Sequence, residues 1–333
     1  MGEVSAGVNG EANNDVVGPG ARLGPVRPGE GNGARPGRTG GVERPADIGE
    51  RGRFIYGETP PSGAVACARR APLLPAEVEE VVDIIARART ERRATRLPER
   101  LRTRDWPSVM EVVLRLDECL AREGAGWKVG AASEEIRRAE GLPGPSPGRI
   151  YQGTIFPSGS VLPPGLFINY RNIECEFAFE LGADLPARDV PYTEGEIRSA
   201  IATLHPVLEL GDCVFLDWYG ASGYFGSCLD NGGGAALVKG PAVKDWQDID
   251  LAESGMDLYL NGWYLKSGKG YAAMGHPVTS LTWAVNWVRA HGRAVVAGEV
   301  VSTGTCTGHC FALPGDFARA DFGPLGTVEV AFE

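Results

Sequence analysis

Residues 173–181 read IECEFAFEL, an alternation of apolar and acidic residues that predicts a β-strand. Successive side chains of a strand point to opposite faces, so the apolar residues would share one face and the glutamates the other. The apolar set is Cys175, Phe177, Phe179 and Leu181, and the acidic set is Glu174, Glu176 and Glu180. The pattern therefore predicts one face that packs in the core and an opposite face that gathers carboxylates.

Glu174 and Glu176 would lie about 7 Å apart along such a strand, where two carboxylates repel unless they are solvated or share a cation. A third carboxylate, Glu209, lies in the apolar run Val207–Leu210, where burial of a lone charge is costly and a partner is expected. Three carboxylates without a converging histidine or cysteine favour Mg²⁺ or Mn²⁺ over Zn²⁺. The simpler alternative is a solvated face on an edge strand.

The size and composition of the chain exclude several classes of protein. Its 333 residues are enough to bury a large core, and its net charge of −10 argues against a surface that binds nucleic acid. The seven cysteines are scattered and form no C-x-x-C pair, which is typical of reduced thiols in the cytoplasm. The start has no apolar signal segment, and no later stretch approaches the ~20 apolar residues of a membrane span. We therefore expect a cytoplasmic protein with no membrane partner.

The composition divides the chain into three parts. Residues 1–72 are rich in Gly, Pro, Arg, Glu and Asn and poor in large apolar residues, which predicts a disordered extension. Residues 73–125 predict a small helical N-terminal subdomain, because residues 77–85 have apolar side chains at helical spacing and Ser108–Glu111 has the form of a capping box. Residues 126–333 contain short β-like runs cut by Gly and Pro, and we interpret them as a β-rich, metal-binding catalytic domain.

Two further helices are predicted within the β-rich part. Thr193–Glu196 has the form of a capping box, which would open a helix that runs to Leu204. Pro277 suits the first turn of another helix, which would end at about Ala290.

A hairpin and two C-terminal strands complete the predicted elements. Asn261-Gly262 joins two apolar runs, and this pair supplies the positive φ angles that a type I′ turn needs. Strands are also expected at residues 299–303 and 326–332. Since strands and helices do not alternate regularly, the expected class is α+β rather than a doubly wound parallel sheet.

Four blocks of the chain resemble, in order, the motifs of the 2-keto-4-pentenoate hydratase / 4-oxalocrotonate decarboxylase group of the fumarylacetoacetate hydrolase superfamily. They are Gly126–Ser133 (GWKVGAAS), Glu174–Phe179 (ECEFAF), Pro206–Glu209 (PVLE) and Ser302–Gly308 (STGTCTG), with Asp230-Asn231 and Gly275–Pro277 before the last block. The resemblance covers about residues 76–333. It implies a mixed β-sheet roll like the C-terminal domain of fumarylacetoacetate hydrolase, with peripheral helices and a small helical N-terminal subdomain.

The resemblance also implies the site. Glu174, Glu176 and Glu209 would hold Mg²⁺ or Mn²⁺, which would chelate the carboxylate and the 2-oxo oxygen of a substrate, and Lys128 would move protons. A metal on the ketone oxygen lowers the energy of the enolate through which this chemistry passes. A lysine near a cation and shielded from water would have a lowered pKa. The alternative for Lys128 is a surface lysine at a strand end.

The metal site does not choose among the hydratase, decarboxylase and C–C hydrolase members of the superfamily. Family hydrolases use a His-Glu pair before the metal-binding strand, but the first histidine here is His205, which disfavours a C–C hydrolase of acylpyruvates. Family hydratases usually carry an aspartate between the lysine block and the glutamate strand, yet residues 141–173 contain no Asp or Glu. Hydration would then rest on Lys128, with Tyr151 or a metal-bound water.

Further candidates are less specific. Asp230 would orient Lys128 or a water, or would form the turn before Gly232–Gly234. Gly304, Thr305 and Gly308 would present backbone N–H groups to a substrate carboxylate, or would form a tight turn, and Thr303 is a further candidate for substrate binding. His309 would touch substrate or be an ordinary loop histidine.

The sequence therefore predicts a metal-dependent lyase that adds water to an acid of the 2-hydroxypenta-2,4-dienoate type through a metal-stabilised enolate. A decarboxylase of a 2-oxo dicarboxylate is the close alternative, and a non-catalytic partner subunit of such an enzyme is the third. The expected partners are a small-molecule 2-oxo acid and, from the resemblance, further copies of the same chain.

Overall fold

Two β-sheets and a set of helices make up the part of the chain that this computed structural model describes, residues 71–216 and 224–333. The larger sheet has the order β2-β1-β10-β5-β6-β7-β3, with β11 also paired to β5, and the smaller sheet has the order β4-β13-β12-β8-β9. Nearly all of the predicted disordered extension, residues 1–72, lies outside the described residues.

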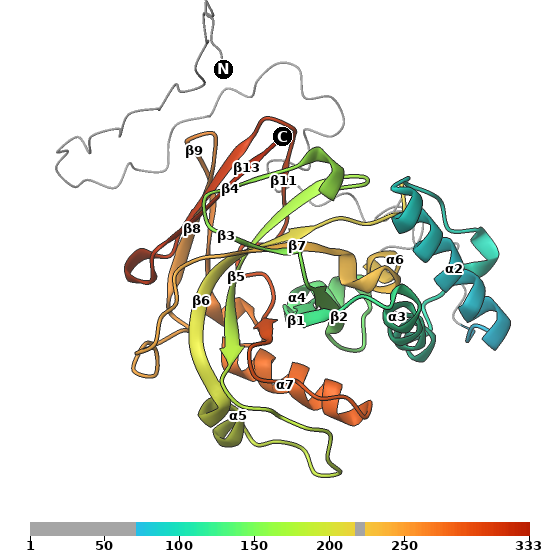
Figure 1. Cartoon of the computed structure of the whole chain (residues 1–333), viewed down its shortest axis with the longest axis horizontal. Coiled ribbons are helices and arrows are strands. Elements are labelled where there is room, and N and C mark those ends of the chain that lie inside the picture. Colours follow the sequence, from blue (N-terminus) through green and yellow to red (C-terminus); the bar gives the residue numbers. More distant parts are fainter. Residues whose placement is uncertain (1–70, 217–223) are drawn as a thin grey trace, which may run out of the picture. The chain divides into compact units, whose positions relative to one another are not determined.

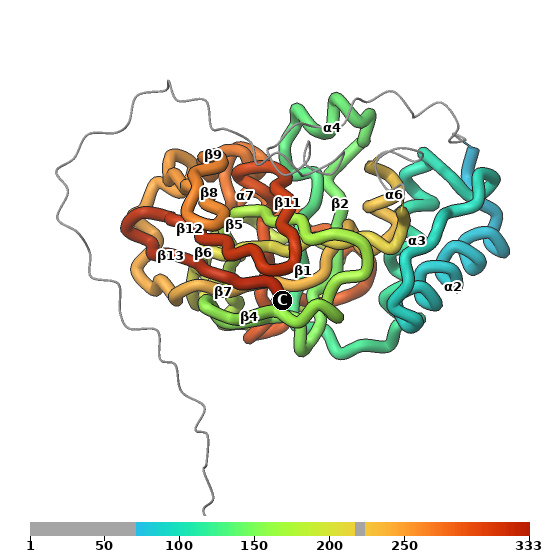
Figure 2. The backbone as a smooth tube through the Cα atoms, turned by 90° about the horizontal axis from the view of Figure 1, so that it is seen from above, coloured from blue at the N-terminus to red at the C-terminus, as the bar shows by residue number. Residues whose placement is uncertain are grey.

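The strands of the larger sheet are β1 (Gly124–Gly130), β2 (Ser146–Tyr151), β3 (Ile155–Pro157), β5 (Arg171–Leu181), β6 (Ile201–Gly211), β7 (Gly234–Lys239), β10 (Val300–Ser302) and β11 (Cys310–Ala312). Those of the smaller sheet are β4 (Ser160–Leu162), β8 (Gly255–Leu260), β9 (Trp263–Lys269), β12 (Phe317–Asp321) and β13 (Thr327–Phe332). The described α-helices are α2 (Pro75–Glu91), α3 (Trp106–Leu120), α4 (Glu134–Glu140), α5 (Glu194–Ala200), α6 (Tyr224–Leu229) and α7 (Pro277–Ala290). Figure 1 and Figure 2 both place α2 and α3 at one end of the molecule and the smaller sheet at the other.

Strand β5 is an interior strand, because it pairs antiparallel with β6 on one side and with β10 and β11 on the other. The register places Glu174 directly opposite Glu209. This excludes a solvated edge strand as the setting of Glu174 and Glu176. The predicted division of the two faces is confirmed, since the apolar set lies in the main hydrophobic core.

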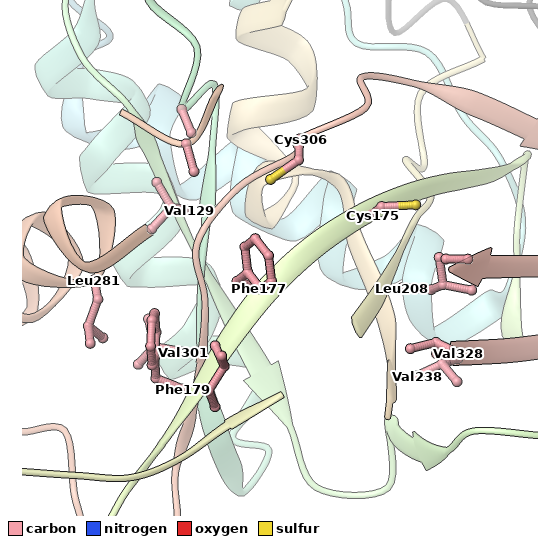
Figure 3. Packing of buried hydrophobic residues seen from close by; sticks show 14 of the residues in the cluster. Val129, Cys175, Phe177, Phe179, Leu208, Val238, Leu281, Val301, Cys306 and Val328 are labelled. Atoms are coloured by element: carbon pink, nitrogen blue, oxygen red, sulfur yellow. The ribbon is translucent and has the colours of Figure 1, made fainter. Parts of the chain in front are cut away.

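The core face of β5 is built on aromatic contacts. Phe177 meets Phe322 with ring centroids 5.6 Å apart, and Phe179 meets Trp246 at 5.4 Å, both edge to face. Figure 3 shows Phe179 close to Val301, with Phe177 farther along the same strand. The packing fixes which face of β5 points away from the core, and therefore where its glutamates point.

Both sheets contain parallel and antiparallel pairs. Strands β1 and β10, β3 and β7, and β4 and β13 run parallel, whereas the other neighbours run antiparallel. Strand β2 is one end of the larger sheet, and β7 lies next to β3 at the other end; β2 and β7 come near each other but are not neighbours in the sheet order. The α+β class with mixed sheets is confirmed.

The predicted N-terminal helices are present, but one of the two predicted caps is wrong. Helix α3 begins at Trp106, and its N-cap is Asp105, whose carboxylate accepts from the Ser108 backbone N–H at 3.0 Å. Ser108 therefore lies inside the first turn instead of capping it, because Asp105 is an equally good cap three residues earlier and Pro107 suits the first turn. None of the helices in the described ranges has the length and apolar character needed to cross a bilayer.

Helices α2 and α3 share a second hydrophobic cluster with α6 and with residues 213–215. The helical segment is thus packed directly on parts of the predicted catalytic domain. The boundary near residue 125 stays a prediction.

Within the β-rich part, one helix end is wrong and the other elements are confirmed. Thr193 and Glu196 form the predicted capping box of α5, but this helix ends at Ala200 and residues 201–211 form β6. Ile201 and Thr203 favour a strand, and pairing with β5 overrides the helical pattern. Helix α7 has the predicted bounds, and Asn261 and Gly262 have φ angles of 53° and 83° in the predicted hairpin.

Replacing Phe179 by alanine tests the role of the aromatic core. The side chain is fully buried, so the variant should lose about 3–5 kcal/mol of unfolding free energy in urea titrations followed by circular dichroism. Trp263→Ala is the control, because Trp263 is 65% exposed and its loss should change stability by less than about 0.5 kcal/mol. Equal losses in the two variants would contradict this assignment of the core.

Candidate active site

Three buried glutamates meet on the larger sheet. Glu174 and Glu176 come from β5 and Glu209 comes from β6, and one carboxylate oxygen of each lies within 4.8 Å of the others. The alternation along β5 and the direct pairing of Glu174 with Glu209 are enough to bring them together. We refer to these three residues as the glutamate triad.

The surroundings of Glu176 disfavour its ionised form. Its Oε2 accepts hydrogen bonds from Ser302 Oγ at 2.5 Å and from the Gly304 backbone N–H at 2.9 Å. Its Oε1 is buried and accepts no hydrogen bond from the residues that the structure describes. Burial, followed by the charges of Glu209 and Glu174, raises the pKa of Glu176 well above its usual value.

An orphaned buried oxygen within a set of three carboxylates fits a hard divalent cation. Such cations take oxygen ligands, and their charge would offset the repulsion that raises the pKa of Glu176. The structure therefore provides a donor set that could bind a divalent metal.

Glu174 is held in its ionised form by polar neighbours. Asn172 Nδ2 donates to Glu174 Oε1 at 2.6 Å, and His309 Nδ1 lies 2.7 Å from the same oxygen. Burial opposes ionisation, but His309, Lys128 and Asn172 outweigh it and lower the pKa of Glu174 to about 2. These contacts also fix the orientation of the carboxylate.

Lys128 extends from β1 toward the glutamate triad. Its Nζ lies 3.1 Å from Glu209 Oε1 and also donates to the backbone carbonyl of Gly232. A Cβ added at Gly148 or at Gly232 would lie 2.9 Å from Lys128 Cε, so the side chain runs through a slot that glycines leave open. A surface lysine is excluded, since Lys128 is 5% exposed.

The predicted lowering of the Lys128 pKa depends on a bound cation and stays a prediction; the protein's own groups act in the other direction. Burial lowers this pKa, but the three carboxylates, Glu209 foremost, outweigh burial and raise it. Burial likewise raises the pKa of Glu209, against the opposing effect of Lys128. The expectation counted a cation but did not count the negative charge of the triad itself.

Two cavities adjoin the pair formed by Lys128 and Glu209. The first is lined mainly by Arg89, Arg122, Arg149, Ile150, Tyr151 and Leu237, and the second by Tyr170, Asn172, Glu174, Tyr224, Ser227 and His309. Lys128 and Glu209 line both. A small acid in the second cavity would therefore lie beside Glu174, Glu209 and Lys128 together.

Asp230 does not contact Lys128 through its carboxylate. Its Oδ1 accepts from Arg89 Nε at 2.7 Å, and its Oδ2 accepts from the Val214 backbone N–H at 2.7 Å. The prediction that Asp230 orients Lys128 directly therefore has no support in this geometry. The residue begins the turn that carries the carbonyl of Gly232, which was the alternative.

The other predicted substrate-binding residues make hydrogen bonds within the protein, and only Tyr151 lines a cavity. The Gly304 N–H donates to Glu176, and Thr305 Oγ1 accepts from Gly308. Thr303 Oγ1 donates to the Phe177 carbonyl at 2.8 Å. None of residues 303–305 lines the two cavities, whereas Tyr151 lines the first and donates to Asp117 at 3.0 Å.

Sequence reasoning missed several residues that support the site. Asn172 lies two positions before Glu174, and the same period-two pattern could have placed it on the acidic face. Ser302 was quoted only as part of a motif, although its hydroxyl contacts Glu176. Asn231 had no signal beyond its place in a motif, and its contact with β2 spans 82 residues.

Comparisons with known proteins support the resemblance found in the sequence. No family model matches the chain. The 2-keto-4-pentenoate hydratase of Paraburkholderia xenovorans (strain LB400) is 25% identical over 214 residues, which are 64% of this chain and 78% of that protein. The 2-oxo-hept-4-ene-1,7-dioate hydratase of Escherichia coli is 26% identical over 232 residues, which are 68% of this chain and 86% of that protein.

A solved structure supports the fold. The 4-oxalocrotonate decarboxylase from Pseudomonas putida G7, complexed with magnesium and adipate, superposes with a TM-score of 0.69 at 22% identity, over 80% of this chain and 100% of that chain. These comparisons confirm the resemblance to the 2-keto-4-pentenoate hydratase / 4-oxalocrotonate decarboxylase group, and the superposition confirms that the chain has the fold of that decarboxylase structure.

Changing Glu176 to glutamine tests the triad as a metal site. A cation at 100 times its dissociation constant should stabilise the wild type by about 2.7 kcal/mol, and the variant should lose most of this gain because it lacks one of three charges. Unfolding experiments with and without added Mg²⁺ measure the stabilisation of the wild type and of the variant. Without metal the variant should be at least as stable as the wild type, because one source of repulsion is removed.

Glu180→Gln is the matched control. Glu180 lies on the same face of β5 but is partly exposed and paired with Lys239 at 2.8 Å. Its variant should keep the full stabilisation by Mg²⁺. A Glu176→Gln protein that binds metal as the wild type does would remove Glu176 from the site.

Proposed function

We propose that this protein is a divalent-metal-dependent hydro-lyase that adds water to a 2-hydroxydienoic acid of the 2-keto-4-pentenoate type. The observation that carries the proposal is the buried glutamate triad with the Lys128 ammonium 3.1 Å from Glu209. Relatives that are named hydratases match most of their own length to this chain, which supports the same reaction class.

Glu174, Glu176 and Glu209 would hold Mg²⁺ or Mn²⁺. The fold neighbour is described with magnesium in one structure and with calcium in another, which supports a hard divalent cation. A bound cation of this kind supplies Lewis-acid polarisation of a 2-oxo group and charge compensation beside it.

The protein's own groups account for binding and proton transfer. Lys128 Nζ donates a proton to a carbon of the dienol, and the attacking water returns a proton, so that the net change is the addition of one H and one OH. Asn172 and His309 keep Glu174 oriented during this exchange. Tyr170 and Tyr224 line the second cavity together with Asn172 and His309, and their rings would limit the access of bulk water.

Decarboxylation of a 2-oxo dicarboxylate is the second candidate, and the first cavity favours it. Arg89 and Arg149 in this cavity are paired with Asp230 and Glu299. Arg122 stacks on the ring of Tyr151 at 4.5 Å, and within the described ranges no carboxylate pairs with it. This unmatched positive charge suits the distal carboxylate of a dicarboxylic acid.

Assay of metal-stripped protein with Mg²⁺ or Mn²⁺ added back decides between the two. The substrates are 2-hydroxypenta-2,4-dienoate and 2-oxohex-3-enedioate, followed by loss of ultraviolet absorbance and by product mass. Metal-dependent gain of one water supports the hydratase, and loss of CO₂ from the dicarboxylate supports the decarboxylase. Absence of turnover with both, despite metal binding, would contradict both proposals and favour a non-catalytic subunit.

Replacing Lys128 by alanine should lower kcat by about 10²- to 10⁴-fold, which is the usual contribution of a general acid–base group. Binding of Mg²⁺ should persist, because the triad is unchanged. Steady-state kinetics and calorimetric titration of the metal measure the two effects. Lys269→Ala is the control, since Lys269 is exposed and pairs with Glu253 at the surface; equal kinetics in both variants would remove Lys128 from the mechanism.

A further inference from the structure

The turn between α6 and β7 has an unusual backbone. Asn231, Gly232 and Gly233 have φ angles of 55°, 62° and 70°, so three consecutive residues adopt the left-handed region. Asparagine tolerates this region better than other residues with a side chain, but the conformation still needs support from its surroundings. The side chain of Asn231 supplies a contact of this kind.

The Asn231 side chain bridges the turn to strand β2. Its Oδ1 accepts from the Arg149 backbone N–H at 2.6 Å, and its Nδ2 donates to the Arg149 backbone carbonyl at 2.9 Å. The amide thus forms two hydrogen bonds to the backbone of one residue, in the manner of a neighbouring strand. It ties the turn before β7 to β2, and these two strands are not paired in the larger sheet.

The same bridge closes the slot that holds Lys128. Gly148 precedes Arg149 on β2 and forms one wall, and Gly232 follows Asn231 and forms the other. A Cβ added at Gly148 would lie 2.5 Å from the Asn231 backbone oxygen and 2.9 Å from Lys128 Cε. The Gly232 carbonyl accepts from Lys128 Nζ at the end of the slot.

We propose that Asn231 is a positioning residue for Lys128. Its two hydrogen bonds set the spacing between the walls and the direction of the Gly232 carbonyl, and so they place the ammonium beside Glu209. Asn231 lines neither cavity, so it acts through Lys128 and does not contact substrate. The inference rests on the proposed function in that Lys128 is taken as the proton-transfer group.

The alternative is a turn that serves stability alone, and Asn231→Gly separates the two. Glycine keeps the left-handed backbone but removes both hydrogen bonds. Asn261→Gly is the matched control, because Asn261 also has a left-handed φ of 53° and also makes two side-chain hydrogen bonds, to Asp316 and Phe317. Its hairpin belongs to the smaller sheet, which contains no member of the triad.

The first readout does not need activity. The Mg²⁺-loaded full-length proteins are treated with an N-hydroxysuccinimide ester of acetic acid, and the acetylation rate of Lys128 is measured by peptide mass spectrometry. Asn231→Gly should raise the rate at Lys128 several-fold while the surface residue Lys269 reacts as before, and Asn261→Gly should change neither. An unchanged rate at Lys128 would overturn the proposal even if no substrate were turned over by the wild type.

The second readout is kinetic. Asn231→Gly should lower kcat by about 10- to 100-fold with little change in KM or in Mg²⁺ affinity. In a Lys128→Ala background the same change should have no further effect on kcat, because the two residues act as one unit. Additive losses, or a matching loss of metal affinity, would show a purely structural role.

Asn231→Asp covers the case in which the glycine variant does not fold. Aspartate keeps the acceptor for the Arg149 N–H but places an oxygen against the Arg149 carbonyl. For Asn231→Asp, the acetylation rate of Lys128 and kcat should both lie between those of the wild type and those of Asn231→Gly. Wild-type values for both, in a folded protein, would overturn the proposal, whereas absence of any wild-type turnover would overturn only the proposed function.

Discussion

Repulsion among three buried carboxylates is the constraint around which the site is built, and each carboxylate is stabilised by a different part of the chain. Glu174 is bonded by Asn172 and His309, Glu176 by residues 302–304, and Glu209 by Lys128. Lys128 supplies one positive charge against three carboxylates, and burial together with the neighbouring carboxylates leaves the pKa values of Glu176 and Glu209 raised. A divalent cation bound by the three carboxylates would supply the missing positive charge with oxygen ligands alone.

The fold can keep this arrangement because the opposite face of β5 is heavily apolar. A slip of one residue in the pairing of β5 with β6 would exchange the two faces, and Phe177 and Phe179 would leave the core while glutamates entered it. The cost of that exchange holds Glu174 opposite Glu209. The aromatic core and the acidic site are therefore consequences of one alternating pattern.

How much could be predicted from the sequence depends on how far apart along the chain the interacting residues lie. The faces of β5 depend on a period of two and are local, so residues 173–181 were sufficient. The convergence of Glu209 on the triad depends on strand register, and only the family resemblance supplied it. The partner of Asp230 was not predictable, because Arg89 lies 141 residues away on a helix with no motif. The Gly304 N–H donates to a carboxylate, as predicted, but this carboxylate belongs to the buried Glu176 and not to a substrate.

The ion pair between Arg89 and Asp230 explains why the N-terminal helices are part of the site. A buried ion pair is weak evidence for stability, since apolar residues of similar volume often serve as well. Apolar residues could not accept the Val214 N–H, however, nor contact the Asp230 carbonyl as Arg89 does. The pair thus fixes the backbone at the start of the turn, while Asn231 fixes the next residue against β2. With both held, the backbone around the Gly232 carbonyl is restrained, and this carbonyl accepts a hydrogen bond from Lys128 Nζ. Helix α2 therefore supports the backbone geometry around Lys128, and its Arg89 also lines the first cavity.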